Sequence, residues 1–116
     1  MKTRQLLSSF IAGSFVVAVA TFGGSALAAD EAAAKALAKK NDCTKCHAVD
    51  KDKKGPSYKK LAAKWTGKAD AEDKLSKFLV SSPKVKLSDG SEDDHKAIDT
   101  KDAKEIKNLL QWILSQ

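Results

Sequence analysis

Two cysteines stand three positions apart, at Cys43 and Cys46, and His47 directly follows the second. On a helix this spacing places both thiols on one face, about one turn apart. Haem carries two vinyl groups on neighbouring pyrrole edges, and each thiol can add across one of them to form a thioether. His47 would then supply an axial imidazole nitrogen to the iron. The motif is the attachment signature of c-type haem.

Other chemistry is conceivable for the same residues. A thioredoxin-like redox pair requires a strand–helix context, and no strand is expected nearby. A structural disulfide between Cys43 and Cys46 would not explain the adjacent His47. A zinc site could use both cysteines with His47 and His95, but neighbouring ligands are unlike the usual separated pairs. We therefore expect Cys43 and Cys46 to bind one haem c and His47 to ligate its iron.

Residues 1–28 have the composition of a cleaved secretory signal peptide. Lys2 and Arg4 precede a short apolar run, which ends in an Ala-x-Ala site at Ala28. An uncleaved membrane anchor is the alternative, but the run is interrupted and short for a span of about 20 residues. Cleavage after Ala28 would leave residues 29–116 as one periplasmic domain, with no stable membrane insertion.

The remaining chain predicts helices, because no run alternates in the manner of a strand. Asp30 can cap a helix over residues 31–40. Apolar residues recur at helical spacing from Tyr58 onward, and Gly67 ends that helix. A domain this short buries a limited core, so a covalent haem would give its helices a large apolar surface to pack on.

The second half of the domain holds two more expected helices and a long connection. The pattern over residues 71–79 is helical, and Pro83 stops it. Residues 84–99 lack periodicity and are expected to form a loop, and loops of this length are usually functional. Thr100 is expected to cap the last helix, with Asp102 in its first turn.

Together these features resemble a class I monohaem cytochrome c in its short bacterial form. The resemblance covers nearly all of the expected mature chain. It implies an all-α fold of four to five helices wrapped around one covalently attached haem, with the last helix packed across the first. It also implies that the carbonyl of Pro56 accepts a hydrogen bond from His47, and such a contact orients a ligating histidine. The matching segments are residues 43–47, 55–58, 61–65 with Gly67, and 109–115.

The sequence departs from this family on the other side of the iron. The usual distal ligand is a methionine in the loop before the last helix, but the only methionine here is Met1. His95 lies in the corresponding loop and is the only other histidine, so we expect it to be the sixth ligand. The alternative is that His95 is an ordinary solvent-exposed loop residue, because charged residues surround it. The sixth coordination position of the iron would then be vacant, occupied by water, or filled by Lys84, Lys86 or Lys96.

Tyr58 and Trp65 are expected in the haem pocket or the core, where their O–H and N–H groups could reach a propionate. The predicted function is electron transfer in the periplasm, by a low-spin haem held by His47 and His95. Its reduction potential should lie below that of histidine–methionine relatives. The alternative is a binder or sensor of CO, NO or oxygen, whose sixth ligand is displaceable or absent. No acid/base pair or nucleophile arrangement is found, so an enzyme is not expected.

The charge of the chain bears on its partners. The formal net charge is +6, and loss of Lys2 and Arg4 would lower it. This modest excess, without interleaved aromatic residues, argues against nucleic acid. We expect a monomer that meets an acidic redox partner through lysines near the motif, although the same lysines could form a merely solvated face. They are Lys45, Lys51, Lys53, Lys54, Lys59, Lys60, Lys64 and Lys68.

Overall fold

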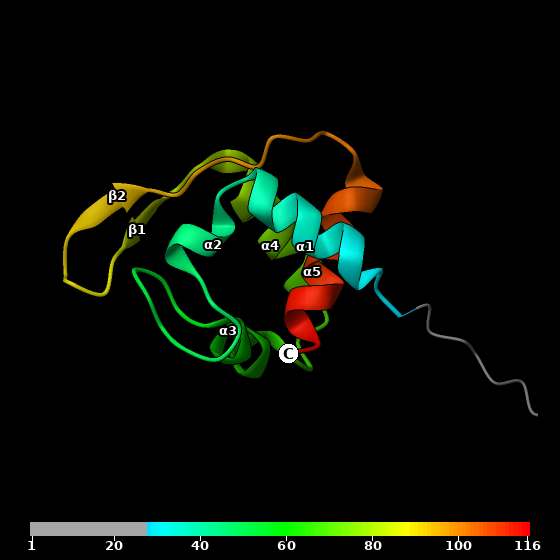
Figure 1. Cartoon of the computed structure of the whole chain (residues 1–116), viewed down its shortest axis with the longest axis horizontal. Helices are drawn as coiled ribbons and strands as arrows, with labels where there is room; N and C mark the ends of the chain where they lie inside the picture. The colour runs from blue at the N-terminus through cyan, green and yellow to red at the C-terminus, as the bar shows by residue number, and fades with distance from the viewer. Residues whose placement is uncertain (1–27) are drawn as a thin grey trace, which may run out of the picture.

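The computed structural model describes residues 28–116, so the expected signal peptide lies outside the described residues except for Ala28. Within this part of the chain, five helices form a small domain, and one short hairpin extends to one side of them (Figure 1). None of these helices is long and apolar enough to span a membrane. The elements are α1 (Glu31–Lys40), α2 (Cys43–Cys46), α3 (Tyr58–Trp65), α4 (Ala71–Ser81), β1 (Lys84–Lys86), β2 (Glu92–Asp94) and α5 (Ala103–Leu114).

The helices begin where local chemistry predicts. The Asp30 carboxylate accepts a hydrogen bond from the backbone N–H of Ala33 at 3.0 Å, so the expected cap of α1 is confirmed. Ser57 caps α3 in the same way through the N–H of Lys60. Each cap satisfies a backbone donor that the first helical turn leaves free.

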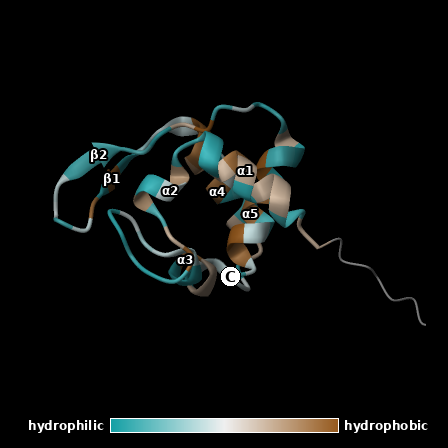
Figure 2. Cartoon of the chain, in the orientation of Figure 1, coloured by the Kyte–Doolittle hydropathy of each residue, from teal (hydrophilic) through white to brown (hydrophobic). Residues whose placement is uncertain are grey.

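The core lies where α5 packs against α1, α3 and α4, which confirms the expected packing of the last helix across the first. Figure 2 shows hydrophobic residues concentrated on these helices, while the hairpin is largely hydrophilic. Most of the buried side chains on α1, α3 and α4 are alanines, which allow the helices to approach closely. The buried apolar residues are Ala34, Ala38, Tyr58, Ala62, Ala71, Ile106, Leu109, Leu110, Trp112 and Ile113.

Residues 84–99 were expected to form a loop, and the structure adds a short hairpin within this segment, at residues 84–94. Strand β1 pairs with β2 in antiparallel register, and Gly90 adopts a positive φ of 88° in the connection. Both strands are three residues long and mostly solvent-exposed, so no alternation of buried and exposed residues marks them. A different signal was available, because Lys84 stands opposite Asp94 and opposite charges stabilise cross-strand pairs.

The cap of the last helix also differs from expectation. Asp102, rather than Thr100, caps α5 by accepting a hydrogen bond from the N–H of Lys104 at 2.9 Å. The Thr100 hydroxyl accepts from the N–H of Asp102 and donates to Glu105 at 2.6 Å. Both residue types are good caps, and the one directly before the helix takes the role.

Candidate haem site

The attachment cysteines lie on a single helical turn, α2, which follows α1 almost directly. Both side chains are half-buried, and they are not joined in a disulfide. Burial raises the pKa of the Cys43 thiol, which packs at the edge of the core. The chain enters this turn through Asp42, whose φ of 58° is in the left-handed region, and leaves it extended at His47. The turn therefore presents two thiols together, with the imidazole following them.

His47 is held by the loop that follows it. Its Nδ1 lies 2.6 Å from the carbonyl oxygen of Pro56, so the two atoms expected to bond are in contact. Because a carbonyl only accepts, Nδ1 carries the proton and the lone pair of Nε2 is left for a metal. The ring also stacks on Tyr58, with centroids 5.6 Å apart and planes inclined by 21°.

Asp52 secures the turn that carries Pro56. Its carboxylate accepts a hydrogen bond from the N–H of Ser57 at 2.8 Å and pairs with the ammonium of Lys60. These two contacts hold the pKa of Asp52 below its usual value, and the contact with Lys60 has the larger effect. The start of α3 is thereby tied to the loop, which fixes the carbonyl that orients the imidazole.

Gly55 lies in a segment that matches the family, but the sequence analysis gave it no role in the site. A Cβ at this position would lie 2.7 Å from Cε1 of His47 and 3.1 Å from its Nδ1. The backbone of Gly55 also donates to the carbonyl of Cys46 at 2.8 Å, which holds it against the ring. Its place directly before Pro56 is a signal that could have identified it, since the Pro56 carbonyl was expected to meet the imidazole.

His95 follows β2 and is fixed through both its backbone and its ring. Its N–H donates to the carbonyl of Pro83 at 2.8 Å, and the Ser82 hydroxyl donates to its carbonyl at 2.5 Å. Its Nδ1 lies 3.0 Å from the carbonyl oxygen of Lys96, and Phe78 meets the ring edge to face at 4.8 Å. Its Nε2 is therefore also left free, as in His47.

The two imidazoles, which are 48 positions apart in the sequence, lie close together, with ring centroids 6.3 Å apart and planes inclined by 45°. Metal–imidazole bonds of about 2 Å on opposite sides of one ion would separate the ring centres by about 6 Å. Burial first, and the neighbouring His47 second, lower the pKa of His95. The neutral imidazole, which is the form that ligates metals, is therefore favoured.

The surroundings of this pair fit a haem. The hydroxyl of Tyr58 is buried without a hydrogen-bond partner among the described residues, and burial raises its pKa to about 12. A buried hydroxyl left in this way is costly, so a polar group from outside the polypeptide, such as a propionate, suits the position. Half-buried apolar side chains border the core nearby. They include Leu37, Val49, Leu61, Leu79 and Ile98.

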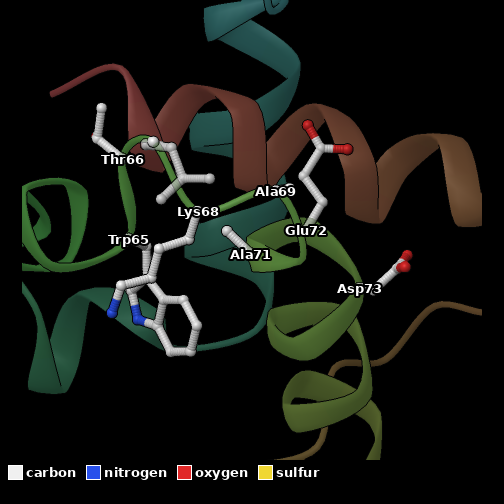
Figure 3. A pocket seen from close by; sticks show the side chains of 9 residues that line it. Trp65, Thr66, Lys68, Ala69, Ala71, Glu72 and Asp73 are labelled. Atoms are coloured by element: carbon white, nitrogen blue, oxygen red, sulfur yellow. The ribbon is translucent and has the colours of Figure 1, made fainter.

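Trp65 is the last residue of α3. It lines an open hollow of about 390 Å³ where α3 ends and α4 begins, with Thr66, Lys68 and Glu72 around it (Figure 3). The ammonium groups of Lys64 and Lys68 lie 5.7 and 5.1 Å from its ring centre. The structure thus brings Tyr58 to His47, while Trp65 meets two lysines.

Two of the three lysines considered as iron ligands are engaged elsewhere. The ammonium of Lys84 lies 3.3 Å from the Asp94 carboxylate, and that of Lys96 lies 2.9 Å from Asp42. Each amine would have to leave a carboxylate and lose its proton before it could bind a metal.

Residues 31–116 match the sequence profile of the cytochrome c family over their whole length. The chain belongs to this family. It is 34% identical over 86 residues to cytochrome c-551 of Pseudomonas aeruginosa, a match that spans 69% of this chain and 73% of that protein. It is 51% identical over 39 residues to cytochrome c-551 of Allochromatium vinosum, covering 34% of this chain and 42% of that one.

Solved cytochromes share the fold. The class 1 cytochrome MtoD of Sideroxydans lithotrophicus ES-1 superposes with a TM-score of 0.72 at 54% identity, over 76% of this chain and 97% of that one. Cytochrome c552 of Nitrosomonas europaea gives 0.57 at 30% identity, over 70% and 96%. The expected small cytochrome c fold is confirmed. The domain carries one covalently bound haem c, and Cys43 and Cys46 fit its attachment motif.

Replacing Gly55 with alanine is expected to destabilise the haem-loaded protein by about 1–3 kcal/mol. The new Cβ would press on an imidazole that Pro56 holds from the same side. Thermal unfolding followed by haem absorption measures the loss. The control is Ala63→Ser, which adds one atom at an exposed position of α3 and should change stability by less than about 0.5 kcal/mol. Equal stability of the two variants would contradict the tight contact at Gly55.

Proposed function

We propose that this cytochrome is a periplasmic electron carrier whose haem iron is ligated by His47 and His95. Membership of the cytochrome c family supports electron transfer by a haem protein. The observation that carries the ligand assignment is the short distance of 6.3 Å between the ring centroids of the two imidazoles. Each has its Nδ1 against a backbone carbonyl, that of Pro56 or of Lys96, so both Nε2 atoms are available.

The protein's part in this function is to keep both ligands in place. When bound, haem supplies one-electron exchange between ferric and ferrous iron. The Pro56 carbonyl and the Tyr58 ring hold His47, while Ser82, Pro83 and Phe78 hold His95. Ligands fixed from several sides would move little when the charge of the iron changes, and little rearrangement favours rapid electron transfer.

The choice of a second histidine also bears on the reduction potential. A methionine ligand raises the potential of a c-type haem. The described residues contain no methionine, since the only one in the chain is Met1. The proposed pair of histidines therefore places this haem lower than histidine–methionine members of the family.

The proposed location and partner follow from the sequence and the charged surface. Residues 1–28 would direct export to the periplasm and be cleaved off. The mature protein would be a monomeric electron carrier and not an enzyme. Lys45 pairs with Asp42, Lys59 with Asp50 and Lys60 with Asp52, so these three lysines add little to the net positive potential near the motif. An acidic redox protein would meet the remaining lysines near the motif. They are Lys51, Lys53, Lys54, Lys64 and Lys68.

Replacing His95 with alanine tests the ligand assignment. The low-spin absorption spectrum of the ferric protein should be lost, because the variant lacks the imidazole whose ring centre lies 6.3 Å from that of His47. The reduced variant should bind carbon monoxide rapidly and stoichiometrically, whereas the unmodified protein should bind it slowly at most. The matched controls are Lys84→Gln and Lys86→Gln, which remove the other candidate amines of the same hairpin and should leave the spectrum unchanged.

Two outcomes would contradict the proposal. An unchanged low-spin spectrum in His95→Ala would exclude this histidine as the ligand. Rapid, stoichiometric binding of carbon monoxide by the unmodified reduced protein would instead favour the binder or sensor of small molecules.

A further inference from the structure

The segment that carries His95 is tied to the end of α1 by a buried asparagine. The side-chain oxygen of Asn41 accepts a hydrogen bond from the N–H of Asp99 at 2.6 Å, across 58 positions of sequence. Its amide nitrogen donates to the carbonyl of Leu37 at 2.9 Å. Asn41 is only 4% exposed, so loss of this partner would leave polar groups buried and unsatisfied.

A second contact ties the same segment to the next residue of the chain. The ammonium of Lys96 lies 2.9 Å from the Asp42 carboxylate, across 54 positions. Asp42 also pairs with Lys45 at 3.1 Å. These contacts hold the pKa of Asp42 below its usual value, and the contact with Lys96 has the larger effect. Asp42 stands directly before Cys43, so this pair links the distal segment to the attachment turn.

The two contacts bracket the residues that orient His95. Lys96 provides the carbonyl that faces Nδ1 of His95, and its side chain is the one that reaches Asp42. Farther along, the N–H of Ile98 donates to the carbonyl of Leu79 on α4. Figure 1 shows this segment, after β2, passing the end of α1 on its way to α5. The segment that carries His95 is therefore held in part by contacts made from the end of α1.

We propose that Asn41 and Asp42 are positioning residues for the distal histidine, and that they limit how often His95 leaves the iron. This inference rests on the proposed ligation by His95. The physical reason is that His95 can leave only when its segment moves, and movement breaks the contacts to Asn41 and Asp42. An external ligand binds only the open form, so its apparent affinity scales with the open fraction.

The two contacts should differ in strength. Asn41 makes its hydrogen bonds in a buried position, where a lost partner is costly. The side chains of Lys96 and Asp42 are 55% and 44% exposed, and exposed ion pairs contribute little and are weakened by salt. Asn41 is therefore expected to dominate, with Asp42 adding a smaller, salt-dependent part.

Cyanide binding to the ferric, haem-loaded protein tests this inference. Asn41→Ala should raise the apparent rate and affinity of cyanide binding about fivefold. Asp42→Asn should raise them about twofold at low salt and less at high salt. Asparagine tolerates the left-handed backbone of position 42, so this milder variant keeps the test open if Asn41→Ala fails to fold.

The chain offers a matched control for each variant. Asn108 also ties two distant segments through its amide, bonding the N–H and carbonyl of Asp30 at 2.7 and 2.9 Å, but at the other end of α1. Asn108→Ala should lower stability without faster cyanide binding. Lys45→Met removes the other ammonium beside Asp42 and should also leave the rate unchanged.

Lys96→Gln should match Asp42→Asn, and the double variant should show no additional increase, because both changes break one pair. Rates in Asn41→Ala and Asp42→Asn no higher than in their controls would overturn the inference. That failure is distinct from failure of the ligand assignment, which an unchanged spectrum of His95→Ala would reveal.

Discussion

Replacing both attachment cysteines, as Cys43→Ser with Cys46→Ser, is expected to yield a chain that loses its haem on denaturation and does not fold stably. The core explains why. Leu109 is the largest side chain that is fully buried, and much of the core contributed by α1, α3 and α4 is alanine. The free energy gained by burying so little apolar surface only slightly exceeds the entropic cost of ordering the chain. Circular dichroism and haem extraction by acidified solvent measure both losses.

The residues between the cysteines provide the control. Thr44→Ala and Lys45→Ala change exposed side chains within the same turn and leave both thiols in place. Both variants should retain covalent haem and unfold cooperatively. A native helical spectrum and cooperative unfolding in the haem-free double serine variant would show instead that the polypeptide core suffices alone.

The helices could be predicted because their determinants are local. Asp30 starts α1 through a hydrogen bond three residues away, and Pro83 lies two residues beyond the end of α4. The hairpin could not be found by burial, because its strands are mostly exposed and contribute little to the core. Thr100 was predicted to cap α5, but Asp102 does so. Both residue types are suitable caps and they lie within one turn, so the sequence alone did not decide between them.

The site shows the same division between local and distant determinants. Cys43, Cys46 and His47 stand together in the sequence, and His95 was proposed because few residue types can ligate an iron. The role of Gly55 depends on how closely a returning loop approaches the imidazole. That of Asn41 depends on a segment 58 positions away. Sequence spacing does not encode these contacts: the place of Gly55 before Pro56 marks it as a candidate, but its contact with the imidazole and that of Asn41 with Asp99 are seen only in the folded structure.

Replacing His95 with methionine is expected to raise the reduction potential by on the order of 0.1 V, within the range of about 0.8 V that axial ligands span. A thioether donates less charge to ferric iron than an imidazole does, so the ferrous state gains relative stability. The backbone of residue 95 is fixed by Pro83 and Ser82, which would hold the new side chain on the same side of the iron. Redox titration followed by haem absorption measures the shift.

Lys84→Met is the matched control, because it adds a methionine to the same hairpin while His95 stays in place. Its exposed side chain should leave the potential unchanged. In His95→Met, a spectrum that reports a methionine–iron bond together with an unchanged or lowered potential would contradict the prediction. If instead the shift appears only when His95 is replaced, the low potential depends on the second imidazole. The general charge of the hairpin would then be excluded as its cause.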